Sequence, residues 1–299
     1  MDRAELLLMG WFVGDGFGGQ TDGMEESEVT SLIDGPITEV YTLEEAQSLS
    51  GQSGPASDTT ILCGLSVMAL EQVDNDHLAS KYRAYDKESG TFPFPQKGDN
   101  AACLTRAPIM ALLAPRFPYT KWEAVVKAET RLTHTAPLAI DAALLLSRAF
   151  ALLVNEEAES AQELCSLLIR EVGKRGWEAK LEVALRTAVN QKMLNPYSFK
   201  ERYQIIPTIT LAFHTLLSPL TLEEGLDAIA RLGGNSRLTC AIYSALKVLS
   251  DHEEVPERYS NEIYPSPTIE AMIKGETLFK RETIKMEKLA EKIATGLSL

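Results

Sequence analysis

The chain has 299 residues and an acidic balance, with 42 Asp and Glu against 29 Lys and Arg and a net charge of −13. A nucleic-acid-binding protein needs a basic face that releases counterions, so this charge argues against a nucleic-acid partner. Hydrophobic residues make up 45% of the chain and charged residues 24%, as in an ordinary globular protein long enough for one large core.

Targeting and membrane segments are not expected. The N-terminus has no cationic start followed by an apolar run, so we expect no signal peptide. The most apolar stretch, residues 136–154, is interrupted by Asp141, Ser147 and Arg148, which favours a buried core helix over a membrane span. The four cysteines are scattered without a Cys-x-x-Cys pair, as is typical of buried free thiols. A cytoplasmic location and no membrane partner are therefore expected.

Helical periodicity dominates the chain. Helices are expected over residues 58–73, 101–113, 121–131, 137–154, 158–172, 177–189, 206–217, 222–232, 237–249 and 277–293. Convincing alternating strands are absent, and the turn-rich segments are residues 14–55, 87–99 and 195–203. The pattern predicts a single all-α domain over residues 1–299, in which residues 265–299 form a C-terminal helical cap.

The helix expected from residue 222 has clear signals at both ends. Thr221 and Glu224 have the spacing of a capping box, and Gly233-Gly234 follows the last periodic residue. A capping box satisfies the free amides of a first turn, and a glycine ends a helix at little cost.

A glycine-rich segment near the N-terminus reads Gly-Asp-Gly-Phe-Gly at residues 14–18 and is followed by Asp22. Glycines tolerate positive φ and let a backbone turn tightly beside a ligand. A purely structural turn would explain the same glycines equally well. Asp22 could act as a general acid or base, which needs a titratable group within about 3 Å of the reacting atom.

Two further segments open predicted helices with polar residues. Ser-Asp-Thr-Thr stands at residues 57–60, where Ser or Asp would also serve as a simple N-cap. Gly-Gly-Asn-Ser-Arg-Leu stands at residues 233–238. Its Arg237 lies in a first helical turn, where a positive charge opposes the helix dipole. We expect its guanidinium either at the surface or paired with Asp58 or a ligand phosphate.

In their order and spacing these segments resemble the ADP-ribosylglycohydrolase family, in particular proteins like the dinitrogenase-reductase-activating glycohydrolase. The resemblance spans roughly residues 4–259 and includes Asn-Ala-Ala-Cys-Leu-Thr-Arg-Ala-Pro at 100–108 and Thr133-His134. His134 is expected to be a capping or packing residue. The resemblance implies a compact orthogonal multi-helix bundle whose cleft is bounded by the three polar segments.

The chain departs from the family at the carboxylates. Family members carry Thr/Ser-Asp-Asp-Thr and Gly-Gly-Asp-Thr-Asp-Thr at the last two segments and use them to hold two magnesium ions. Here Thr59, Asn235 and Arg237 replace Asp, so Asp58 is the only surviving carboxylate of that ligand set. Since Mg²⁺ takes several oxygen ligands, usually including carboxylates, a two-metal site is disfavoured and no cofactor is expected.

The candidate site residues combine the residue chemistry with the resemblance. Asp22 and Asp58 are the candidate catalytic groups. The candidate ligand-binding residues are Gly14, Asp15, Gly18, Ser57, Thr59, Thr60, Phe92, Asn100, Gly233, Gly234, Asn235, Ser236 and Arg237.

Three functions remain open at this point. The chain is a divergent hydrolase of ADP-ribosyl or related nucleotide groups, an inactive relative that binds such a group, or a structural or partner-binding protein on the same fold. The retained hydroxyls and glycines favour the first two, and we favour a hydrolase-like protein with a metal-poor site. The expected partner is a small-molecule nucleotide or an ADP-ribosylated protein.

Overall fold

The computed structural model describes residues 3–38, 98–131, 133–190, 197–198, 200–252 and 255–259, and the statements below concern these residues. They form ten α-helices and three short 3-10 helices, and no strand occurs among them. The all-α bundle expected from the periodicity is confirmed. The helices expected over residues 58–73 and 277–293, and the C-terminal cap, lie outside the described residues.

From residue 101 onward the helices agree closely with the periodic segments of the sequence, whereas the two helices before residue 33 were not among those expected. The α-helices are α1 (Arg3–Gly18), α2 (Glu26–Leu32), α6 (Ala107–Leu113), α7 (Tyr119–Arg131), α8 (Pro137–Val154), α9 (Ala161–Arg175), α10 (Ala179–Asn190), α11 (Ile205–Leu217), α12 (Leu222–Leu232) and α13 (Ser236–Asp251). The 3-10 helices are η1 (Ala101–Arg106), η2 (Ala114–Arg116) and η3 (Glu201–Tyr203).

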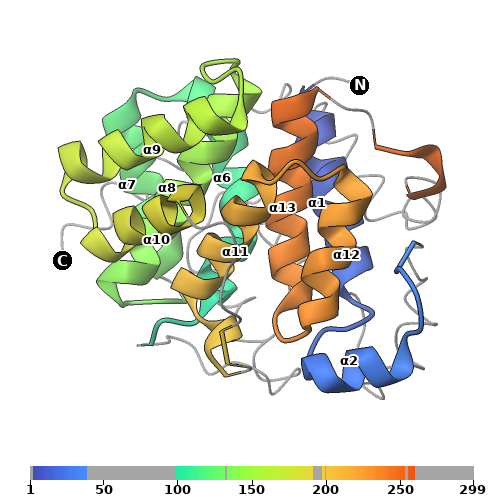
Figure 1. Cartoon of the computed structure of the whole chain (residues 1–299). Helices are drawn as coiled ribbons and strands as arrows, with labels where there is room; N and C mark the ends of the chain where they lie inside the picture. Colours follow the sequence, from blue (N-terminus) through green and yellow to red (C-terminus); the bar gives the residue numbers. More distant parts are fainter. Residues whose placement is uncertain are drawn as a thin grey trace.

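The helix α13 packs against both α1 and α12 near the middle of the molecule (Figure 1). α1 presents Gly10, Gly14 and Gly18 to α13, at the spacing of one helical face. A Cβ on Gly14 would lie 2.2 Å from the carbonyl oxygen of Cys240, and one on Gly18 would lie 2.4 Å from that of Ser236. The two backbones therefore approach more closely than larger residues would permit.

This packing corrects the turn expected over residues 14–18. Those residues form the last turns of α1, and the chain turns only after Gly18. A spacing of four residues between glycines suits a helix as well as a turn, and the contact with α13 selects the helix. The short helix α2 was likewise expected to be part of a turn-rich segment. Its first turn is stabilised by Glu28, whose carboxylate accepts from Glu25 N at 2.7 Å.

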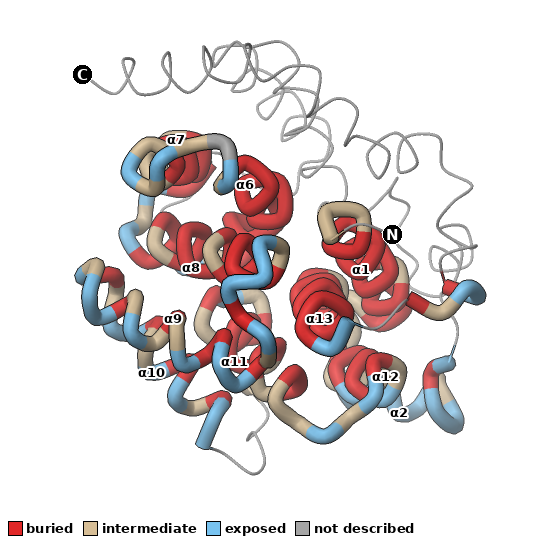
Figure 2. The backbone as a smooth tube through the Cα atoms, turned by 90° about the horizontal axis from the view of Figure 1, so that it is seen from above, coloured by how far each residue is buried: buried red, intermediate tan, exposed pale blue. Residues whose placement is uncertain are grey.

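The helix α8 is the other core element. Figure 2 shows it buried along most of its length, in contrast to the exposed rim helix α2. α8 has the length and apolar composition that a membrane span would need, but 78% of it is buried inside the fold. Its proline at the first turn, where no amide donor is required, marks its start. The core helix expected from the sequence is therefore confirmed.

The capping signals of α12 are also confirmed. The Thr221 hydroxyl accepts from Glu224 N at 3.3 Å, and the Glu224 carboxylate accepts from Thr221 N at 2.9 Å. Gly233 ends the helix with a φ of +64°.

Cys103, Cys165 and Cys240 are buried free thiols, as expected, whereas Cys63 lies outside the described residues. Burial raises the pKa of Cys103 and of Cys165 to about 12, so both stay protonated.

Candidate functional site

The turn after α1 and the turn before α13 are joined by their backbones. Gly234 N donates to Met24 O at 2.9 Å, and Gly23 N donates to Gly234 O at 2.8 Å. Gly233 and Gly234 both have a φ of +64°, and a Cβ on Gly233 would lie 2.1 Å from Met24 O. Glycine is needed here because the backbone is left-handed and the two turns approach closely. Two segments from opposite ends of the described chain thus form one surface, which we call the α1–α13 site (residues 19–24 and 233–238).

Arg237 and Asp22 pair across this site. Arg237 N donates to Asp22 Oδ1 at 3.3 Å, and Arg237 Nε lies 3.7 Å from Asp22 Oδ2. The two side chains are 23% and 27% exposed, so the pair is shielded from bulk water on most sides. Gly19 makes room for it, because a Cβ there would lie 3.1 Å from Arg237 Cζ. Arg237 therefore lies beside Asp22, and its pairing with Asp58 or with a ligand phosphate stays a prediction, because Asp58 lies outside the described residues.

Tyr203 borders the same site, although no motif pointed to it. Its hydroxyl donates to Gly234 O at 3.2 Å. Burial, and then the nearby charge of Asp22, raises the pKa of Tyr203 to about 12. The phenol therefore stays protonated at neutral pH and acts as a hydrogen-bond donor. Its position at the end of η3, a 3-10 helix of three residues, leaves no periodicity or spacing by which the sequence could have revealed it.

Ser236 and Asn235 are positioned by hydrogen bonds within the fold. Ser236 is buried, and its Oγ donates to Gly18 O at 2.7 Å. This hydrogen bond joins the start of α13 to the end of α1. Asn235 is half-buried, and its Nδ2 donates to Thr208 Oγ1 at 3.4 Å. Of the two, Asn235 remains at the surface of the site.

Asn100 lies beside the segment that carries Tyr203. It pairs with Gln204 in an isolated antiparallel bridge, and Ile205 N donates to Asp99 O at 2.8 Å. The Asn100 side chain caps η1, because its Oδ1 accepts from Ala102 N at 2.8 Å. A ligand-binding role for Asn100 stays a prediction.

The remaining candidates divide into two groups. Gly14, Asp15 and Gly18 are buried in α1, and both glycines face α13 rather than a turn. Ser57, Asp58, Thr59, Thr60 and Phe92 lie outside the described residues, so their roles stay predictions.

A buried polar cluster connects α7 to η1. Arg106 forms an ion pair with Glu129, and its Nη2 donates to Thr133 Oγ1 at 2.6 Å. His134 Nδ1 lies 2.9 Å from the same hydroxyl. Burial, and then the charge of Arg106, lowers the pKa of His134 to about 3. His134 is therefore a neutral packing residue, as expected.

The described side chains of the α1–α13 site do not fit a pair of magnesium ions. Arg237 contributes a positive charge to it, and the carboxylate of Asp22 is engaged by that arginine. Asn235 offers an amide in place of a carboxylate. Within the described ranges, no three His, Cys, Asp or Glu side chains gather so that they could hold a metal ion. Hard divalent cations such as Mg²⁺ take oxygen ligands, usually including carboxylates.

Comparison with known proteins covers nearly the whole chain. The family model described as ADP-ribosylglycohydrolase matches residues 1–288. The chain belongs to the ADP-ribosylglycohydrolase family. This match extends past residue 259, where the resemblance traced through the motifs ends. A solved structure described as an ADP-ribosylglycohydrolase-related protein complex has the same fold, with a TM-score of 0.68 at 18% identity over 91% of this chain and 95% of that one. No curated protein matches the chain.

Proposed function

We propose that this member of the ADP-ribosylglycohydrolase family binds an ADP-ribosyl or related nucleotide group at the α1–α13 site without a magnesium pair. The pairing of Arg237 with Asp22 is the observation that carries the proposal. At a position where the family carries a metal-binding carboxylate, this chain supplies a cation of its own.

A guanidinium suits the diphosphate of an ADP-ribosyl group. Arginine recognises phosphate oxygens with a planar fork of N–H donors and keeps its charge at all physiological pH values. Asp22 engages Arg237 through Nε, and a guanidinium carries four further N–H donors on its Nη atoms. Asp22 therefore orients Arg237 while leaving it donors for a ligand.

Binding is favoured over turnover because Asp22 is committed to Arg237. An acid–base group has to reach the reacting atom, whereas both Asp22 oxygens face donors of Arg237 at 3.3 and 3.7 Å. Asp22 is thus better placed as a positioning residue than as a general acid. Asp58 remains the other candidate for that role.

Isothermal titration calorimetry with ADP-ribose tests the proposal. We expect saturable binding with the same affinity in MgCl₂ and in EDTA. Arg237→Gln should weaken binding about tenfold or more, because a charge-assisted hydrogen bond contributes on the order of 1.5–3 kcal/mol. Arg186→Gln, in an exposed ion pair on α10, is the matched control and should bind as the unmodified protein does. Binding that requires Mg²⁺ would contradict the proposal, and no binding at all would favour a structural role.

An activity assay separates binding from turnover. ADP-ribosylated arginine and serine peptides are incubated with the protein, and released ADP-ribose is measured by chromatography. We expect no release above that of an Asp22→Asn variant. Release that depends on Asp22 would show a hydrolase instead.

A further inference from the structure

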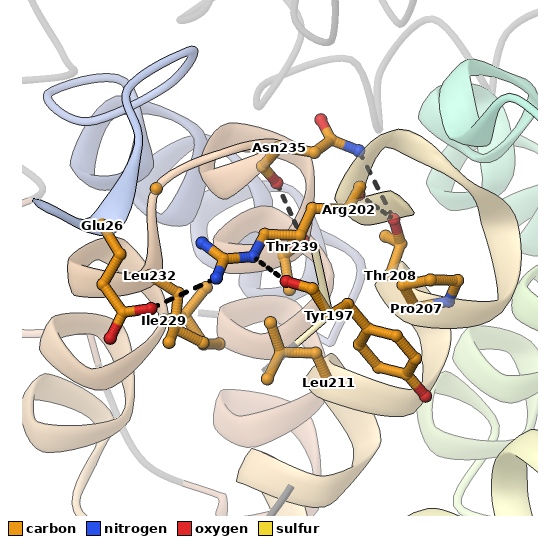
Figure 3. Close-up of a pocket in the computed structure, with 11 residues that line it drawn as sticks. Glu26, Tyr197, Arg202, Pro207, Thr208, Leu211, Ile229, Leu232, Asn235 and Thr239 are labelled. Atoms are coloured by element: carbon orange, nitrogen blue, oxygen red, sulfur yellow. Dashed lines mark hydrogen bonds and ion pairs between the residues drawn. The ribbon is translucent and has the colours of Figure 1, made fainter. Parts of the chain in front are cut away.

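A cavity of about 220 Å³ lies between η3, α11, α12 and the start of α13 (Figure 3). One wall is apolar and consists of Pro207, Leu211, Ile229 and Leu232. An apolar cavity of about 150 Å³ holds a benzene molecule. This cavity therefore has room for a single ring with one small substituent.

The polar wall of the cavity carries Arg202, whose side chain is only 9% exposed. Its Nε donates to Tyr197 O at 2.9 Å, and its Nη2 donates to Glu26 Oε2 at 3.2 Å. Its Nη1 is buried and has no acceptor within the described part of the chain. A buried N–H without an acceptor is costly, so an acceptor oxygen from a ligand would relieve that cost.

The charges on this wall favour a neutral acceptor. Glu26 already balances the charge of Arg202. A ligand carboxylate would add a second negative charge close to that of Glu26, and like charges at short distance repel each other. A carboxamide avoids this repulsion, because its carbonyl accepts from Arg202 while its N–H groups are donors that suit the Glu26 carboxylate.

We propose that this cavity binds a small neutral molecule with a ring-sized apolar body and a carboxamide group. A wider groove of about 750 Å³ shares Glu26, Tyr197 and Arg202 with the cavity and offers the ligand a way in. Glu26 is 52% exposed, so it can move aside and return. The cavity adjoins the α1–α13 site through Asn235, but this inference does not rest on the binding of an ADP-ribosyl group.

Ligand-observed NMR titration of the full chain with benzamide and benzoate tests this chemistry. The two probes share a ring and differ in having a neutral amide or a carboxylate. We expect saturable benzamide binding and benzoate binding that is weaker by about tenfold or more. Arg202→Met should weaken benzamide binding by about tenfold or more, since a hydrogen bond from a charged group is lost.

Two variants that fill the cavity with a larger side chain test the proposal independently, in case Arg202→Met does not fold. Leu211→Trp and Leu232→Trp place an indole in the cavity and should abolish benzamide binding. Leu217→Trp, on α11 outside the cavity, is the matched control and should retain it, with circular dichroism confirming that each variant is helical. The proposal is overturned by a lack of benzamide binding, by equal binding of benzoate, or by unchanged benzamide affinity in the folded filling variants.

Discussion

Gly14 of α1 lies directly against the backbone of Cys240 in α13, so closely that a Cβ on Gly14 would come within 2.2 Å of the Cys240 carbonyl oxygen. The contact holds two helices from opposite ends of the described chain in one register. Because the turns that follow α1 and precede α13 build the α1–α13 site, the site depends on this close approach.

Gly14→Ala should therefore lower the free energy of unfolding by about 1–3 kcal/mol, because the added methyl group meets rigid backbone. Gly173→Ala on α9 is the matched control, since nothing lies within 4 Å of the Cβ that it would add. That change should be neutral or stabilising by up to about 1 kcal/mol, since alanine favours a helix over glycine. Urea unfolding of the three proteins measures both effects, and equal effects would contradict the packing argument.

Glu129→Gln should be among the most destabilising single changes, at about 3–5 kcal/mol, because it leaves the buried Arg106 without its counter-charge. Glu182→Gln removes an exposed partner of Arg186 and should change the free energy of unfolding by less than about 1 kcal/mol. Denaturant unfolding measures the free energy of unfolding of both variants. The double variant Arg106→Met/Glu129→Leu should be milder than Glu129→Gln, since no charge is left alone. A Glu129→Gln protein as stable as the unmodified one would contradict the buried pair.

His134 should make the protein sensitive to acid. Its pKa is about 3 in the folded protein against 6.5 in the unfolded chain, chiefly because of burial. Between these pH values the unfolded state binds one more proton, so stability is fully present above about pH 6.5 and is lost as the pH falls towards 3. His134 contributes up to about 1.4 kcal/mol per pH unit to the slope of the free energy of unfolding against pH.

We compare the free energy of unfolding of the unmodified protein and of His134→Asn from pH 7 to pH 4. The carboxylates are the same in both proteins, so the difference between them is the contribution of His134. We expect the slope to be shallower in the variant. Parallel slopes would show that His134 does not titrate on unfolding.

The combined change Thr59→Asp, Asn235→Asp and Arg237→Asp should create Mg²⁺ binding, because with Asp58 it restores the four carboxylates of the family pattern. Isothermal titration calorimetry with MgCl₂ measures the gain. Arg237→Asp alone is the control and should bind no Mg²⁺, since two carboxylates of the set are still missing. A folded triple variant that binds no Mg²⁺ would show that the scaffold of the site has changed beyond its ligands.

Much of the fold could be predicted from the sequence, because local signals carry it. The ends of α8 and α12 agree with the periodic segments to the residue, and the capping box of Thr221 and Glu224 is present. The helix α2 could not be predicted in this way. It has a single buried residue, Val29, so its apolar pattern is too sparse to separate it from a turn.

The candidate site was only partly predictable. The motifs indicated Asp22 and Arg237 as separate candidates, but their pairing joins residues 215 positions apart. No motif in the sequence includes Tyr203 or Arg202. They border the two proposed sites only because η3 packs beside the turn at Gly234.

By itself, the amino-acid sequence determined most of the helices, the resemblance to the ADP-ribosylglycohydrolase family and the departure from the carboxylate pattern of that family. These properties are carried by residue type and by spacing along the chain. Only the tertiary structure decided that the glycines at 14 and 18 are helix contacts and that Arg237 turns back to Asp22. The physical reason is that close packing of α1 on α13 brings distant backbones within contact distance, and no local pattern records which distant atoms will be there.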